Sequence, residues 1–269
     1  MRITFTGTGA ANGIPGYFQA DRVSEYARVH RGEDVRYRAG AVIDGVLKID
    51  WGPDTFACCE RLGMRAKEWT HVFFTHSHDD HFAPREFQYL FPPFLPMEHP
   101  KPLVYGNAAV VDGFLGQFNH VEEVERFVIR SFAPLDVAGY RVTPIHAYHK
   151  LDEDSLNLIF ERDGRSILYG TDTGVYQEDT WEFLAGRRLD CVILDCTDGM
   201  VPSEYWGHLS CRELLAVADR MRAIGAAHDG TIFCSTHHGS AGEATHEELE
   251  RFFAPHGVVV AFDGMTLEV

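Results

Sequence analysis

The sequence Thr75-His76-Ser77-His78-Asp79-Asp80-His81 places three imidazoles and two carboxylates within seven residues. It directly follows Val72-Phe73-Phe74, a short apolar run that is typical of a buried strand. The polar side chains therefore gather where a strand ends, a frequent location of functional groups in α/β proteins. Imidazole nitrogens and carboxylate oxygens are the ligands that Zn²⁺, Mn²⁺ and Fe prefer. The stretch predicts a metal site, and a polar loop with coincidental histidines is the less favoured interpretation.

The spacing within this stretch indicates two ions. His76 and His78 are two residues apart, so in extended backbone both side chains point to the same side and can bind one ion. Asp80 and His81 follow where the chain is expected to turn, and their side chains are expected to point elsewhere. We therefore expect Asp80 and His81 to contribute to a second ion.

Length and composition indicate a globular α/β protein. The chain has 269 residues, of which 45% are hydrophobic, enough for one large domain with a sizeable core. It contains no internal repeat and no low-complexity linker, so we expect a single domain that covers residues 1–269. Its 40 acidic and 24 basic residues give a net charge of −16, which disfavours binding of a long nucleic acid.

The sequence shows no apolar signal segment and no run of about 18 apolar residues, so we expect a cytoplasmic protein with no membrane partner. No Cys-x-x-Cys pair is present, and we expect reduced, mostly buried thiols, with Cys196 as a less favoured metal neighbour. The six cysteines are Cys58, Cys59, Cys191, Cys196, Cys211 and Cys234.

Apolar runs and turn signals predict an alternation of strands and helices. Asp44-Gly45 indicates a two-residue hairpin, and Ser210 with Glu213 forms a capping box at the start of a helix. Thr245 is expected to cap the last helix. Strands are predicted at 3–6, 41–43, 46–49, 72–75, 103–105, 137–144, 156–160, 166–169, 192–194, 232–234 and 258–262. Helices are predicted at 55–67, 108–118, 210–224 and 245–253.

Three segments are less regular. The loop 7–13 has two glycines in Gly-x-Gly spacing, but no amphipathic helix follows at once, so we expect a tight turn beside a site and no dinucleotide fold. The arginine-rich segment 21–38, strand-like at 35–38, is expected to be a solvated arm paired with acids; the alternative is an arginine that binds a phosphate. Prolines in the aromatic stretch 82–102 predict a semi-rigid loop. That loop either walls a substrate pocket, covers a homodimer contact, or covers the core.

Further candidate ligands follow later strands. Asp172 comes just after the strand at 166–169, and His237 just after the strand at 232–234, while His146 and His149 follow the strand at 137–144. We expect His76, His78 and either His146 or His149 to bind one ion, and Asp80, His81 and His237 to bind the other. Asp172 would bridge the two ions, about 3.5–4 Å apart, and a water held between them would lose a proton near neutral pH. No role is assigned to His238.

The motif His76-x-His78-x-Asp80-His81, with the later ligands, resembles that of the metallo-β-lactamase superfamily. The resemblance implies an αββα sandwich, with two mixed sheets, helices outside, and the metals at one edge. Within the superfamily the sequence is similar to the phosphoribosyl cyclic phosphodiesterase of phosphonate breakdown. The stretches with this similarity are Gly7-Thr8-Gly9-Ala10-Ala11-Asn12-Gly13-Ile14-Pro15, Leu194-Asp195-Cys196 and Ala261-Phe262-Asp263-Gly264-Met265.

The resemblance also assigns residues that spacing leaves open. It places the third histidine of the first site at His149, and it places His208 where that family has a histidine thought to protonate the leaving group. A histidine that titrates near neutral pH suits this role. That family also has a cysteine cluster for a structural zinc after its N-terminal loop, and the stretch 17–22 here has no cysteine.

We therefore expect a dinuclear metal-dependent hydrolase that cleaves a small phosphodiester, cyclic phosphates included, by attack of metal-bound hydroxide. Two divalent ions, Zn or Mn with Fe as an alternative, are the expected cofactors, and Asp80 and His208 the expected catalytic residues. The alternatives are a hydrolase of a thioester or lactone, and a non-catalytic biosynthetic or binding member of the superfamily. A tRNA 3′-end nuclease is disfavoured by the acidic charge.

Overall fold

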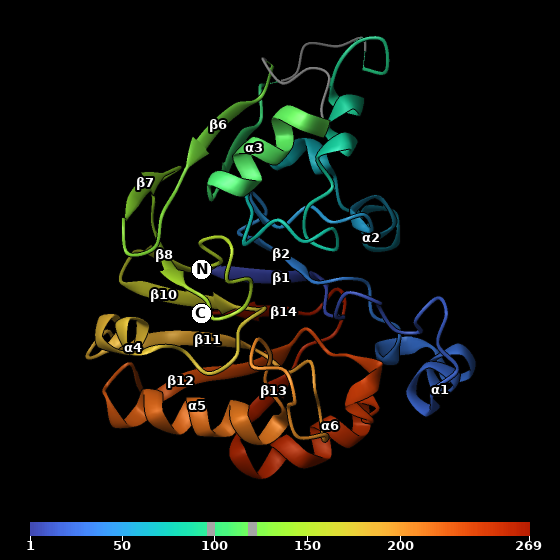
Figure 1. Cartoon of the computed structure of the whole chain (residues 1–269), viewed down its shortest axis with the longest axis vertical. Helices are drawn as coiled ribbons and strands as arrows, with labels where there is room; N and C mark the ends of the chain where they lie inside the picture. The colour runs from blue at the N-terminus through green and yellow to red at the C-terminus, as the bar shows by residue number, and fades with distance from the viewer. Residues whose placement is uncertain (96–99, 118–122) are drawn as a thin grey trace.

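Two sheets of seven strands each lie face to face in the computed structural model, which describes residues 1–95, 100–117 and 123–269 (Figure 1). The first sheet has the order β14-β1-β2-β3-β4-β5-β6 and the second the order β13-β12-β11-β10-β9-β8-β7. Both sheets are mixed, and each contains a run of parallel strands, β3 to β6 in the first and β10 to β13 in the second. The carboxyl ends of these parallel strands lie at one edge of each sheet.

The elements have the following bounds. The first sheet contains β1 (Arg2–Gly7), β2 (Gly40–Ile43), β3 (Leu47–Ile49), β4 (His71–Phe73), β5 (Leu103–Gly106), β6 (Glu125–Val128) and β14 (Thr266–Glu268). The second contains β7 (Leu135–Val137), β8 (Tyr140–His146), β9 (Leu156–Arg162), β10 (Arg165–Gly170), β11 (Leu189–Asp195), β12 (Ala227–Thr236) and β13 (Val258–Val260). The helices are α1 (Arg22–His30), α2 (Thr55–Leu62), α3 (Ala108–Gln117), α4 (Glu178–Leu184), α5 (Cys211–Ala223) and α6 (His246–Phe253).

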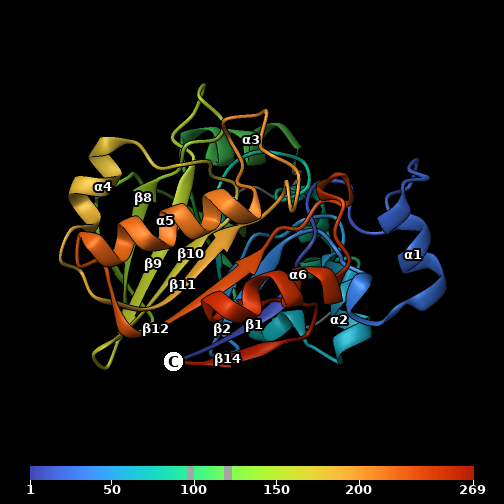
Figure 2. The ribbon, with the colours of Figure 1, turned by 90° about the horizontal axis from the view of Figure 1, so that it is seen from below.

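The central strands, such as β10 and β11, are largely apolar because both of their faces are buried, whereas the edge strands β6 and β14 carry exposed polar residues. In β11, Cys191 and Ile193 point into the core between the sheets, whereas Val192 and Leu194 pack under the outer helices. Helices α4, α5 and α6 lie on the outer side of the second sheet, and α2 and α3 on that of the first (Figures 1 and 2). The predicted αββα sandwich is confirmed.

Most predicted elements are confirmed, and the differences have local causes. The helix predicted at 55–67 ends at Leu62, because Gly63 adopts a left-handed conformation and donates to the Cys59 carbonyl. The strand predicted at 137–144 is a hairpin that turns at Ala138 and Gly139, both at positive φ. Phe118, the last residue of the helix predicted at 108–118, lies outside the described residues. Sequence reasoning missed α1, α4, β6 and β14.

The arginine-rich arm differs from the prediction. Its helix α1 begins after Asp21, whose side chain accepts from the Ser24 amide. Arg22 and Arg28 pair with acids as expected, but Arg36 is buried. The Arg36 guanidinium donates to Thr8 Oγ1 and the Ala261 carbonyl, so it is neither solvated nor open to a phosphate.

The aromatic stretch 82–102 also differs, because residues Pro84–Leu90 form a 3₁₀ helix where no regular element was predicted. Phe82 and Phe87 lie in the core under the first sheet, while Tyr89 and Phe94 are exposed. Residues 96–99 of this stretch lie outside the described residues. Among the helices described, none is long and apolar enough to cross a membrane.

Candidate metal centre

The candidate ligands meet where the strands of both sheets end. The heptapeptide follows β4, His149 follows β8, Asp172 follows β10, and His237 follows β12. Asp172 and His237 adopt positive φ angles of 52° and 58°, which few residues other than glycine do. Strained backbone of this kind is concentrated at functional sites.

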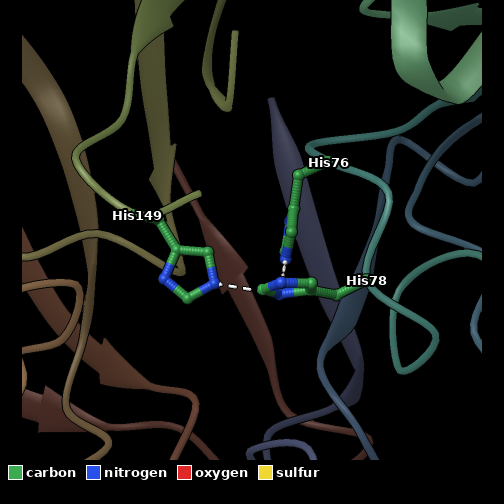
Figure 3. A group of neighbouring side chains, drawn as sticks. All are labelled: His76, His78 and His149. Atoms are coloured by element: carbon green, nitrogen blue, oxygen red, sulfur yellow. Dashed lines mark hydrogen bonds between the residues drawn. The ribbon is translucent and has the colours of Figure 1, made fainter. Parts of the chain in front are cut away.

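His76, His78 and His149 form the first cluster (Figure 3). Nδ1 of His78 lies 2.9 Å from Nε2 of His76 and 3.1 Å from Nε2 of His149. Nδ1 of His149 donates to the Gly207 carbonyl at 3.0 Å, which leaves Nε2 with a lone pair for an ion. The neighbouring alternative, His146, lies outside this cluster, with Nδ1 3.3 Å from Asp179.

Asp80, His81, Asp172 and His237 form the second cluster. Oδ2 of Asp172 lies 3.0 Å from Nε2 of His81 and 3.1 Å from Nε2 of His237. Oδ1 of Asp172 faces the first cluster and lies 3.6 Å from Nε2 of His149. One carboxylate therefore offers an oxygen to each cluster, as a bridging ligand must.

Three buried atoms of the second cluster support an ion between them. His81 Nε2, Asp172 Oδ2 and His237 Nε2 have no hydrogen-bond partner among the described residues. Buried polar atoms without partners are costly, and a cation would satisfy all three. The atoms of each cluster lie within 4.8 Å of one another, compatible with ligands about 2.0–2.2 Å from a shared ion. The donor set therefore fits a pair of divalent cations.

The protonation states also suit cations. Burial lowers the pKa of His76 well below its usual value, so its imidazole is neutral as a ligand must be. Burial also acts to lower the pKa of His81, but the carboxylates of Asp172, Asp80 and Asp50 raise it well above its usual value. The three carboxylates thus favour a positive charge at this position, and a metal ion that binds Nε2 of His81 would displace its proton.

Two buried carboxylates, one behind each sheet edge, orient these ligands. Asp50, directly after β3, accepts from Nδ1 of His81 at 2.8 Å and from the Thr75 hydroxyl, which lies 3.0 Å from Nδ1 of His76. The contacts of Asp50 with His81 and Thr75 were not predicted from the sequence. The one feature of the sequence that could have indicated them is the position of Asp50 at the end of a buried strand.

Asp195, the last residue of β11, has the corresponding place in the second sheet. It accepts from the Thr197 hydroxyl, whose oxygen lies 2.8 Å from Nδ1 of His237. It also accepts from Nδ1 of His208 at 2.9 Å. Burial acts to lower the pKa of His208, but Asp195 outweighs it and raises this pKa to about 9.

His208 lines a cavity of about 320 Å³ at the two clusters, together with His78, Asp80, His149, Asp172 and His237. The loop 10–13 forms part of its wall, which agrees with the tight turn predicted beside a site. Asp79 is exposed and lies outside the clusters.

His238 and Cys196 lie outside both clusters. His238 is buried, and its backbone pairs with Thr8 and Ala10. Cys196 Sγ lies 3.6 Å from Cys211 Sγ, and Cys196 belongs to neither candidate ligand cluster.

Comparisons with known proteins agree with this fold and site. The profile of the beta-lactamase superfamily domain matches residues 47–228, so the chain belongs to this family. No curated protein matches the chain in sequence. The family and the two ligand clusters support a metal-dependent hydrolase.

Several solved structures are similar over the whole chain. A diphosphatase from the PhnP family has a TM-score of 0.79 at 24% identity, covering 100% of this chain and 98% of that chain. Zn²⁺-bound PqqB from Methylobacterium extorquens has a TM-score of 0.75 at 17% identity, covering 100% of both chains. The short form of human tRNase Z has a TM-score of 0.67 at 18% identity, covering 100% and 99%. These structures share the fold of this chain, and the family model confirms the superfamily resemblance inferred from the sequence motifs.

Proposed function

We propose that the chain is a single-domain dinuclear hydrolase that cleaves a small phosphodiester, cyclic phosphates included. The observation that supports the dinuclear site most strongly is the orientation of Asp172, with Oδ1 toward His149 and Oδ2 toward His81 and His237. In this proposal His76, His78 and His149 would hold one ion, Asp80, His81 and His237 would hold the other, and Asp172 would offer one carboxylate oxygen to each. When bound, such a pair of Zn²⁺ or Mn²⁺ ions supplies Lewis acidity and lowers the pKa of water.

The chain's own groups supply the remaining chemistry. Nδ1 of His208 donates to Asp195, so a second proton at Nε2 is available to a leaving oxygen. With its pKa raised to about 9, His208 is protonated at neutral pH. The P–O bond to the leaving oxygen breaks as that oxygen takes the proton, and the oxygen of water forms the new P–O bond. A protonated acid of this kind favours an alkoxide leaving group, as in a phosphodiester.

The lining of the cavity supports a small substrate. No lysine or arginine is among the described residues that line it, so its own side chains offer no site for further phosphates. A long nucleic acid, which needs many cationic contacts, does not fit such a lining.

Metal analysis and a substrate panel test the proposal. Protein purified without added metal should contain two divalent ions per chain, and it should hydrolyse bis-p-nitrophenyl phosphate faster than a thioester or a lactone. Turnover of the thioester or lactone without the phosphodiester would favour the alternative hydrolase. Absence of turnover throughout, with metal bound, would favour a non-catalytic role.

A further inference from the structure

A second cavity, of about 430 Å³, lies next to the candidate metal centre. We call it the aromatic cavity, because it is lined by Tyr148, Tyr205 and Trp206. Tyr205 and His208 line both this cavity and the metal cavity. The two cavities therefore adjoin at His208, the residue proposed to protonate the leaving oxygen.

The segment that separates the two cavities is held to the metal ligands. The Gly207 carbonyl accepts from Nδ1 of His149, and the Tyr205 hydroxyl donates to the His149 carbonyl at 3.3 Å. A side chain at Gly174 would overlap the Trp206 carbonyl, so the glycine permits this close backbone approach. These contacts fix the aromatic rings relative to the metal centre.

The aromatic rings form a platform and not a cage. The ring of Trp206 lies 4.6 Å from that of Tyr148 and 4.9 Å from that of Tyr205, between centroids. Rings this close are in contact with each other and leave no space between them for a quaternary ammonium group. Such a surface suits a flat ring that stacks on it.

Trp206 is much more exposed to solvent than the other three tryptophans. It is 41% exposed, whereas Trp51, Trp69 and Trp181 are 8%, 4% and 2% exposed. An exposed indole beside the metal cavity is available to a ligand, and its fluorescence would report a ligand that stacks on it.

The charges in the aromatic cavity balance when His208 is protonated, which favours an uncharged occupant. Arg220 is paired with Glu178 at 2.8 Å, and Glu213 adds a second carboxylate. Gln177 and Ser203 offer uncharged hydrogen-bonding groups for the edge of a ring.

We propose that the aromatic cavity binds the base of a nucleoside that contains the leaving oxygen, so that the substrate is a nucleoside phosphodiester. This inference rests on the proposed function and narrows its substrate class. Trp206 and Tyr205 stack on the base, and Tyr205 and His208 separate the base from the reacting phosphoryl group.

A pair of cyclic substrates tests the inference kinetically. Trp206→Ala should lower kcat/KM for adenosine 2′,3′-cyclic phosphate about 10-fold, mainly through KM, because stacking is lost from both ground and transition states. Trp206→Phe, which keeps a ring, should recover most of the loss. Ethylene cyclic phosphate has no base, so its kcat/KM should fall far less than that of the adenosine substrate in both variants. Phe56→Ala, at an exposed aromatic residue on α2, is the matched control.

Fluorescence titration of the holoprotein tests binding without turnover. Adenosine should quench the tryptophan emission saturably, ribose 5-phosphate and choline should not, and Trp206→Phe should abolish the response. Quenching by choline without adenosine, equal kinetic losses on both substrates, or an effect of Trp206→Ala confined to oligomeric state would overturn the inference. If the wild type turns over neither substrate, the proposed function fails, and the adenosine titration alone then decides whether the cavity binds a base.

Discussion

Oδ2 of Asp195 lies 2.9 Å from Nδ1 of His208, in a fully buried position behind the second ligand cluster. The same carboxylate accepts from the backbone amides of Asp172, Thr197 and Leu209. Asp195 therefore connects His208, the proposed acid, with Asp172, the proposed bridging ligand.

Asp195→Asn should lower both activity and stability. The amide cannot stabilise a charged His208, and its NH₂ group would face backbone donors. We expect kcat to fall about 100-fold and the free energy of unfolding to fall by about 1–3 kcal/mol, measured by steady-state kinetics and urea denaturation.

Asp190→Asn is the matched control, since Asp190 lies at the other end of β11 and accepts from Ser166 away from the site. Equal activity of the two variants would contradict the role of Asp195.

His208→Gln should show which step needs the proton. Hydrolysis of phosphodiesters with alkoxide leaving groups should slow by about 100-fold or more, because these groups need protonation. Release of p-nitrophenolate, which leaves without a proton, should change far less. His146→Gln is the control, because His146 pairs with Asp179 outside both clusters. Equal losses for both kinds of leaving group would refute an acid role for His208.

The fold was predictable where burial and capping act locally. Val192-Ile193-Leu194 is apolar at every position because both faces of β11 are covered, so the run was recognisable as a strand. The capping box of Ser210 and Glu213 places the start of α5 to within one residue. The helix α1 was not recognisable, because the only apolar residues that it contributes to its small cluster with Ile14 are Val23 and Ala27. Two apolar residues are too few to form a visible helical pattern in the sequence.

The motif of candidate ligands was predictable because each of these residues follows a strand, but the roles of buried polar residues whose partners are distant in the sequence were not. Arg36 contacts residues 28, 225 and 210 positions away in the sequence, and nothing near Arg36 indicates these partners. The role of Asp50 was missed for the same reason, because its partner His81 lies 31 positions away in the sequence. The choice between His146 and His149 likewise depends on the path of the chain after β8, which residue spacing does not determine.

Asp80→Ala and Asp79→Ala provide a matched test of the second ion. Asp80 lies in the second cluster, whereas the adjacent Asp79 is exposed and outside it. Asp80→Ala should reduce the metal content from two ions per chain to about one, measured by elemental analysis, and Asp79→Ala should keep two. Unchanged metal content in Asp80→Ala would contradict the assignment of Asp80 as a ligand.

Chelation of the metals should lower Tm of the wild type by about 5–10 °C, since ligands that bind the folded state stabilise it.

Gly52→Ala should disturb the metal centre by steric overlap alone. A Cβ atom at Gly52 would overlap the carbonyl oxygen of Asp80, so the ligand loop must shift. We expect a loss of about 1–3 kcal/mol in the free energy of unfolding, together with weaker metal binding, measured by urea denaturation and metal titration. Gly116→Ala on α3 is the control, because a Cβ atom there meets nothing within 4 Å. Wild-type metal affinity in Gly52→Ala would show that the loop tolerates the shift.

His246 should make the stability of the protein depend on pH. Nδ1 of His246 accepts from the Arg36 guanidinium at 2.9 Å, and its Nε2 lies 3.4 Å from carboxylate oxygens of Glu33 and Glu250. Burial lowers the pKa of His246, the Arg36 charge lowers it further, and Glu33 and Asp34 oppose the change.

Because the folded pKa lies below the unfolded value of about 6.5, the unfolded chain binds the proton first as pH falls. Stability should therefore decrease on acidification below about pH 6.5. His246→Asn keeps an acceptor for Arg36 but does not titrate, so its urea midpoint should fall less between pH 7.5 and 5.5 than that of the wild type. His256→Asn, at an exposed histidine, should behave as the wild type does. A parallel decline in wild type and His246→Asn would show that other groups determine the acid sensitivity, since the variant removes only this imidazole.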